Sequence, residues 1–126
     1  MIRFIEGLNE DILGIEAVGQ VTHEDYRDIL SPTVSKLLEK GPLRLLYVVG
    51  PEFTGYQPRA IVDDTTLGLK HWQEFPFVAL VTDVDWIQNS VRMFKPFFPG
   101  EVRLFPLSEL ESAKAWILNP QAPAKV

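Results

Sequence analysis

Apolar residues occur along this chain in five short runs, which predict five strands. The runs cover residues 2–5, 12–18, 43–49, 76–81 and 102–105. The first two flank a polar stretch of hairpin length, so we expect them to pair antiparallel. The third and fourth are almost continuously apolar, which is typical of strands that are covered on both faces.

Between these runs, apolar residues recur at the three- to four-residue spacing of helices, and four helices are predicted. Thr22 with Asp25, and Ser108 with Glu111, have the spacing of capping boxes at two helix starts. A proline favours the first turn of a helix, and an aspartate can cap one. The predicted helices run from Thr22 to near Lys40, from Pro58 to Trp72, from Asp85 to near Pro96 and from Ser108 to Ile117.

Three residues interrupt these patterns. Gly14 and Gly19 lie in the second apolar run and predict a bulge or a bend there. Pro32 lies inside the first predicted helix, where it lacks the amide that would bond the carbonyl of Asp28. We therefore expect a kink near Pro32.

The elements follow one another in the order β-β-α-β-α-β-α-β-α. Repeated alternation of strand and helix requires mainly parallel strands with right-handed crossovers and helices outside the sheet. We predict a single α/β domain over residues 1–118, with a mixed, mostly parallel sheet of about five strands flanked by four helices. Residues 119–126 lack periodicity and hold two prolines, so we expect a flexible C-terminal tail.

Composition removes several classes of function. The 126 residues carry a formal net charge of −5, which would repel a phosphate backbone, so nucleic acid is not an expected partner. The absence of cysteine excludes disulfides, thiolate metal sites and thiol nucleophiles. No signal-peptide pattern, long apolar run or nucleotide-binding glycine motif is found, so we expect a cytoplasmic protein without a cofactor.

Several residue clusters, taken in order, resemble those of one known family. They are Phe53 to Tyr56 after the central strand, Asp64 in the next helix, residues 79–83 leading to Trp86, the strand at 101–105, and residues 113–117. The chain resembles the SpoIIAA-like family, whose members look like STAS domains and share features with the CRAL-TRIO lipid-binding fold. The resemblance covers residues 1 to about 118 and implies a non-enzymatic binding or regulatory module.

The stretch after the central strand departs from the pattern of the related anti-sigma-factor antagonists. Those proteins carry an Asp-Ser-Ser/Thr-Gly motif in this loop, and its first serine is phosphorylated. Here Glu52-Phe53-Thr54-Gly55 takes that place, with Phe53 at the acceptor position. The resemblance therefore implies the fold without the switch, and the Thr54 hydroxyl is expected to serve a loop or a cap. We expect the 51–58 loop, which includes Tyr56, and the adjacent helix to contact a protein partner.

The segment from Arg92 to Pro99 combines three phenylalanines with two cations and offers a second hypothesis. These rings are expected to cover the sheet core, because a small domain needs its aromatic residues for burial. The alternative is an apolar-ligand or lipid-binding protein, in which Trp86, Phe94 and Phe97 would touch the ligand. Membrane contact is compatible with this composition but is not favoured, and a homodimer is possible.

A third hypothesis is a carboxylate-metal enzyme acting on phosphate compounds. Glu52, Asp83 and Asp85 follow two neighbouring predicted strands, so they could meet at one edge of the sheet and hold Mg²⁺. Turn and cap roles explain Asp83 and Asp85 equally well, so no metal site is assigned.

The remaining polar residues have simpler expected roles. Asp63 and Asp64 are adjacent on a helix and point about 100° apart, so they cannot converge as an acid–base pair. We expect Asp64 to bind a backbone amide of the neighbouring loop, with ligand contact as the alternative. His23 and His71 are expected at the surface.

Overall fold

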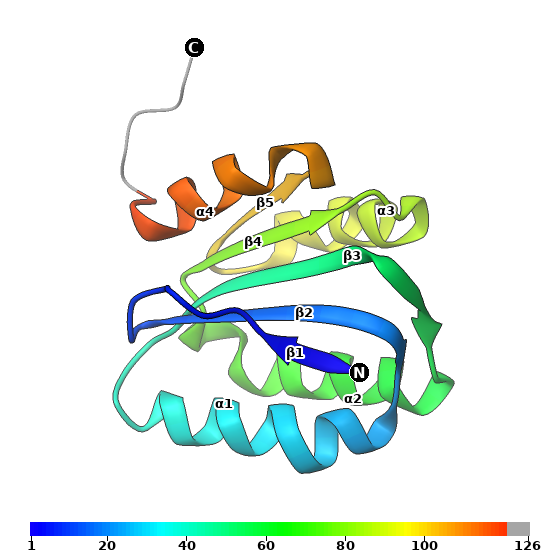
Figure 1. Ribbon diagram of the computed structural model, residues 1–126. Coiled ribbons are helices and arrows are strands. Elements are labelled where there is room, and N and C mark those ends of the chain that lie inside the picture. The colour runs from blue at the N-terminus through cyan, green and yellow to red at the C-terminus, as the bar shows by residue number, and fades with distance from the viewer. Residues whose placement is uncertain (121–126) are drawn as a thin grey trace.

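The computed structural model describes residues 1–120, except for the side chains at positions 68 and 69 (Figure 1). The strands are β1 Ile2–Phe4, β2 Ile12–Val21, β3 Arg44–Tyr56, β4 Phe77–Thr82 and β5 Glu101–Phe105. The α-helices are α1 Ser31–Leu38, α2 Pro58–His71, α3 Asp85–Phe94 and α4 Leu110–Leu118. Short helical segments of other types are η1 Asp25–Leu30, η2 Trp72–Glu74, η3 Lys95–Phe97 and η4 Leu107–Glu109.

The strands form one sheet in the order β1-β2-β3-β4-β5. β1 pairs antiparallel with β2, and all the other neighbours are parallel. The order of the strands across the sheet is therefore the same as their order along the chain. The predicted hairpin and the predicted mixed, mostly parallel α/β sheet are confirmed.

The helices are divided unequally between the two faces of the sheet. α1, α2 and α3 connect consecutive parallel strands, and right-handed crossovers that run in one direction place them all on the same face. α4 lies alone on the opposite face, above the sheet in Figure 1, where Ala113, Trp116 and Ile117 pack on Leu46 and Val48. The sheet thus separates two cores. The larger core includes Ile15, Tyr26, Leu30, Val34, Tyr47, Leu80 and Ile87.

β3 is longer than its apolar run predicted. Residues 50–56, which we expected as a loop, continue the strand and pair with the end of β2, Phe53 opposite Gly19 and Tyr56 opposite Val21. The register shifts on both sides of Gly19, whose φ is 60°, so the predicted bulge is confirmed there. Gly14 is regularly paired, and a Cβ there would meet Leu8 Cδ1 at 2.5 Å. The register of the β2–β3 pair differs on the two sides of this bulge. The bulge thus allows β3 to stay paired with β2 beyond residue 50.

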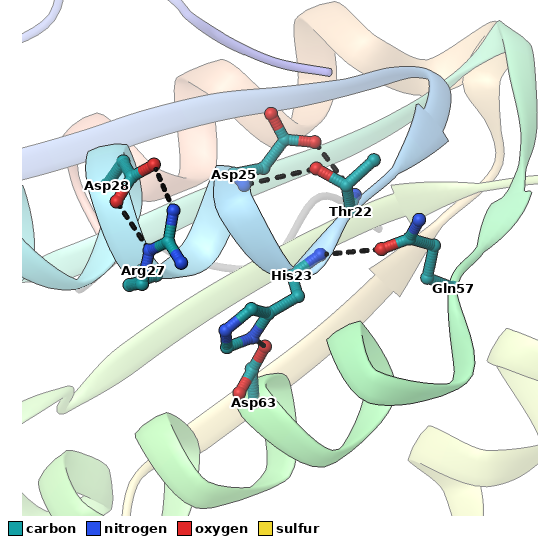
Figure 2. Close-up of polar contacts among 7 residues, drawn as sticks. All are labelled: Thr22, His23, Asp25, Arg27, Asp28, Gln57 and Asp63. Carbon is teal, nitrogen blue, oxygen red and sulfur yellow. Dashed lines mark hydrogen bonds and ion pairs between the residues drawn. The ribbon is translucent and has the colours of Figure 1, made fainter.

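The first helix begins as the capping box predicted. The Thr22 amide donates to Asp25 Oδ2 at 2.8 Å, and the Asp25 amide donates to Thr22 Oγ1 at 3.2 Å (Figure 2). The irregularity expected at Pro32 is a π-helical turn, η1, which precedes α1 directly. Because Pro32 cannot bond the carbonyl four residues back, wider π-type bonding accommodates the proline ring.

Two other predicted helix caps were wrong. α3 begins at Asp85 itself, with Val84 as its N-cap and no side-chain cap, while the Val84 amide donates to the Thr82 hydroxyl at 3.0 Å. No side-chain hydrogen bond caps α4 either, so Ser108 and Glu111 do not form the predicted capping box. The η4 turn precedes α4 and takes up Ser108. A capping box requires an extended backbone at its first residue, and Ser108 instead has the helical backbone of the η4 turn.

Among the described helices, none is long and apolar enough to span a membrane.

The C-terminal end of α4 is capped by the Asn119 amide, which donates hydrogen bonds to the Ala115 and Trp116 carbonyls. Most of the predicted tail, residues 121–126, lies outside the described part of the chain.

Candidate functional site

A cavity of about 480 Å³ lies between the sheet and the helices α2 and α3. Ligand sites in proteins have volumes of about 300–1,000 Å³, so this one is large enough for a small molecule. Its floor is made of side chains from β2, β3 and β4, and its walls come from α2, η2, α3 and η3. Most of the lining is apolar. The apolar lining includes Ile15, Leu45, Leu80, Ile61, Leu67, Trp72, Phe75, Ile87, Val91 and Phe98.

The sequence forms this floor through the alternation of side chains along parallel strands. Ile15, Tyr47 and Leu80 are neighbours across β2, β3 and β4 and point to the same face. α2 packs on η1 and β3. The space over β3 and β4 that α2 does not cover is the cavity.

Exposed aromatic side chains border the cavity on the α3 side. Trp86 is 49% exposed, Phe94 68% and Phe97 72%, and all three line the cavity. The expectation that these phenylalanines cover the sheet core was therefore wrong for Phe94 and Phe97, whereas Phe98 is packed against the core. Phe94 lies on the last turn of α3 and Phe97 on η3, and at these positions both rings are exposed instead of packed on the sheet. A broad apolar border results.

One polar cluster interrupts the apolar lining. The Tyr26 hydroxyl donates to Asp64 Oδ1 at 2.7 Å, and the hydroxyls of Tyr47 and Tyr56 share a hydrogen bond of 2.6 Å. Asp64 is exposed to solvent through the cavity, although protein atoms surround much of its carboxyl group. The expected hydrogen bond from a backbone amide to Asp64 is replaced by the one from Tyr26.

The protonation of this cluster follows from its position. Desolvation raises the pKa of Asp64, and the hydrogen bond from Tyr26 opposes that rise without cancelling it. Burial also raises the pKa values of Tyr26, Tyr47 and Tyr56, and the charge of Asp64 raises them further. The three phenols therefore stay protonated and neutral, and Asp64 is the acidic group of this cluster.

The cavity brings together some of the predicted site residues and leaves out the rest. Tyr56, Asp64, Trp86, Phe94 and Phe97 all line it. Tyr56 lies edge-to-face with Trp86 at a ring separation of 6.0 Å.

Four predicted residues of the β3 extension lie outside this lining. Glu52 is exposed and lies 3.7 Å from Arg3, and Phe53 packs edge-on against Tyr56 at 5.1 Å. Thr54 is exposed, and Gly55 has a φ of 142°. Their backbone belongs to a strand, which corrects the predicted loop.

The predicted carboxylate cluster for a metal is not formed. Glu52 is directed to Arg3, while Asp83 Oδ1 accepts the Leu107 amide at 3.0 Å. Within the described residues, no three His, Cys, Asp or Glu side chains are grouped so as to hold a metal ion. The strand extension carries Glu52 away from the edge where Asp83 and Asp85 lie.

Both histidines are more buried than predicted. His23 is 16% exposed, its Nδ1 pairs with Asp63, and its amide donates to Gln57 Oε1 at 3.0 Å (Figure 2). His71 Nδ1 lies 2.9 Å from Glu74 Oε1, and its Nε2 is buried with no hydrogen-bond partner in the described part of the chain. The His23 pair joins the start of the first helix to α2. Both histidines therefore serve contacts between elements.

Sequence reasoning missed Tyr26 and Tyr47 as members of the site. A signal was present, because both were placed on buried faces, and a buried tyrosine hydroxyl usually finds a hydrogen-bond partner. Tyr47 also stands in an otherwise aliphatic run. The distance between these residues and Asp64 in the sequence concealed their contact.

Taken together, the fold and the site define a small α/β domain with three helices on one face, one on the other, and an apolar cavity closed at one point by an aspartate and three tyrosines. The chain belongs to the SpoIIAA-like family, whose family model matches residues 12–118. This finding confirms the predicted family and fold.

One solved structure is similar over almost the whole chain. It is an uncharacterized protein from the DUF3478 family with a SpoIIAA-like fold, from Shewanella loihica PV-4. The two chains are 31% identical with a TM-score of 0.74, over 93% of this chain and 92% of the other. No curated protein matches this chain.

Proposed function

We propose that this protein is a non-enzymatic binding protein that holds a small, largely apolar molecule in the cavity between α2 and α3. The observation that carries this proposal is the cavity itself, with its volume of about 480 Å³ and its mostly apolar lining. The resemblance of the family to the CRAL-TRIO fold points the same way, but only as a fold-level analogy.

The size of the cavity argues against a packing defect. Protein interiors are packed as densely as organic crystals, and voids larger than one water molecule, which occupies about 30 Å³ in the liquid, are rare. This cavity is open to solvent at its aromatic border, and its volume of about 480 Å³ is of the size of a ligand site. A domain that keeps such a space leaves apolar surface in contact with water, at a cost of about 25 cal/mol per Å². A bound apolar molecule removes that cost.

The border of the cavity supports the same function. Phe94 and Phe97 are among the most exposed large side chains and adjoin the interior space directly. Single exposed apolar residues are ordinary, but a contiguous border around a cavity marks a binding site. These rings would cover the outer end of a bound molecule.

The hypothesis of a protein partner at residues 51–58 stays a prediction. The backbone of residues 53–56 is paired with β2, so a partner would meet side chains on a strand and not a free loop. The cavity is a concave site with a mostly apolar lining, and for that reason we place the binding function there.

Binding of N-phenyl-1-naphthylamine, an apolar dye that fluoresces when it leaves water, tests the proposal. We expect saturable enhancement of the dye's fluorescence by the wild-type protein. Thr65→Trp places a large ring at a lining position of α2 and should reduce the dye's affinity by about tenfold or more. Thr66→Trp is the matched control, because Thr66 is exposed on the same helix and does not line the cavity.

Equal binding by the two tryptophan variants would place the dye outside the cavity. No binding by the folded wild-type protein, with folding checked by circular dichroism, would rule out the proposed function.

A further inference from the structure

Asp64 is the one carboxylate that lines the cavity among the described residues, and only one of its two oxygens is hydrogen-bonded there. Oδ1 accepts the Tyr26 hydroxyl at 2.7 Å. Oδ2 has no hydrogen-bond partner among the described residues, although the side chain is accessible from the cavity. A carboxylate can accept several hydrogen bonds, so Oδ2 is available to a bound molecule.

Among the described residues, no cation pairs with Asp64. The neighbouring groups of η1 and β3 are the hydroxyls of Tyr26, Tyr47 and Tyr56, which are neutral. On α2, the adjacent Asp63 is paired with His23. In the part of the chain that the structure describes, Lys95 of η3 is the only cation that lines the cavity, and it forms no ion pair with Asp64.

We propose that the bound molecule is an amphipathic amine, with its apolar body in the cavity and its protonated amino group against Asp64 Oδ2. This inference rests on the proposed binding function and specifies the class of ligand. An ammonium group donates hydrogen bonds to the unused oxygen and pairs its positive charge with the carboxylate.

Other polar ends fit the same place less well. A carboxylate would lie beside another carboxylate, and like charges at such short range repel each other strongly. It would also find the Tyr26 hydroxyl already committed to Asp64, and the Tyr47 and Tyr56 hydroxyls bonded to each other. A neutral hydroxyl can donate to Oδ2, but it leaves the charge in place. The site therefore ranks amines first, alcohols second and carboxylates last.

Three probes with the same ten-carbon chain test this ranking: decylamine, decanol and decanoate. Each is titrated below its aggregation concentration against the protein loaded with N-phenyl-1-naphthylamine, and displacement of the dye gives the dissociation constant. We expect decylamine to bind more tightly than decanoate by about tenfold or more, because hydrogen bonds between charged groups are the strong ones. Decanol should fall between them.

Two variants assign the preference to Asp64. Asp64→Asn keeps an oxygen for the Tyr26 hydroxyl and removes the charge, so decylamine should lose its advantage over decanoate. Asp63→Asn removes the same charge one residue away on the same helix, where the carboxylate faces His23. It should keep the advantage of decylamine.

The outcomes separate this inference from the proposed function. If all three probes displace the dye and decanoate binds as tightly as decylamine, the cavity binds apolar molecules and the amine inference is overturned. An amine preference that persists in Asp64→Asn, or that Asp63→Asn removes equally, also overturns it. If the dye itself does not bind, the proposed function fails and the amine inference fails with it.

Discussion

At the scale of single residues, the proposed binding group Asp64 is expected to lower the stability of the folded protein. Its pKa in the folded protein lies above the ordinary value of 3.8, chiefly because of desolvation. The folded state therefore holds the Asp64 proton more tightly than the unfolded state does. As the pH rises from the unfolded pKa through the folded pKa, this group lowers the free energy of unfolding, and its full cost is present above both values. Such a cost is typical of functional positions.

We predict that Asp64→Asn raises the melting temperature at about pH 7 and changes it little at about pH 3, where the wild-type carboxyl is protonated in both states. Thermal unfolding followed by circular dichroism at both pH values measures the difference. A variant that is less stable than wild type at both would show that Asp64 contributes through its hydrogen bond from Tyr26 instead.

Gly100 is a position where the backbone leaves no space for a side chain. A Cβ there would lie 2.6 Å from the Pro76 carbonyl oxygen and 2.7 Å from that of Phe75. These are backbone atoms at the start of β4, and they cannot move without disturbing the hydrogen bond from the Glu101 amide to Pro76. We predict that Gly100→Ala destabilises the protein by about 1–3 kcal/mol in urea unfolding.

The control for this substitution is Glu101→Ala. Its side chain is exposed and pairs only with Arg103 at the surface, so its loss should cost less than about 1 kcal/mol. Equal effects of the two substitutions would contradict the steric explanation.

At the scale of elements, the capping box of Thr22 and Asp25 fixes the start of the first helix. Removal of an N-terminal cap typically costs about 1 kcal/mol. We predict a loss of this size for Thr22→Ala in urea unfolding, because the Asp25 amide loses its acceptor. Thr33→Ala is the control, since the Thr33 hydroxyl is exposed and donates only to the Ile29 carbonyl four residues back. A larger loss for Thr33→Ala would contradict the importance of the cap.

The elements also show what local sequence can and cannot predict. The Thr22 box formed as its spacing indicated, whereas Ser108 and Glu111 have the same spacing and formed none, because the η4 turn occupies that position. Likewise, Gly50 and Pro51 indicated the end of the central strand, yet pairing with β2 extends β3 to Tyr56. In both cases, a neighbouring element outweighed the local signal.

At the scale of the whole molecule, the alternation of strands and helices was sufficient to predict the sheet, its mostly parallel pairing and the four α-helices. It was not sufficient to predict the cavity. The cavity depends on the separation of α2 and α3 over β3 and β4, which is set by packing between residues distant in sequence. For the same reason, the contact of Tyr26 with Asp64, 38 residues apart, could not be derived from periodicity.

Occupation of the cavity should stabilise the whole domain. A ligand that binds only the folded state at about 100 times its dissociation constant adds about 2.7 kcal/mol to the free energy of unfolding. We therefore predict that saturating decylamine raises the melting temperature of the wild-type protein by several degrees. The same amine should have little effect on Thr65→Trp. An equal increase in both proteins would show that the amine acts outside the cavity.

The unequal division of helices also has a consequence for the order in which the protein is made. The chain leaves the ribosome from its N-terminus, so β1 to β5 and the helices of the cavity side are available before α4. Until residues 110–118 emerge, the apolar face formed by Leu46, Val48, Ala79 and Val81 has no helix to cover it. The cavity side of the nascent domain can therefore assemble first, while its opposite side remains a surface for chaperones or for aggregation until residues 110–118 have emerged.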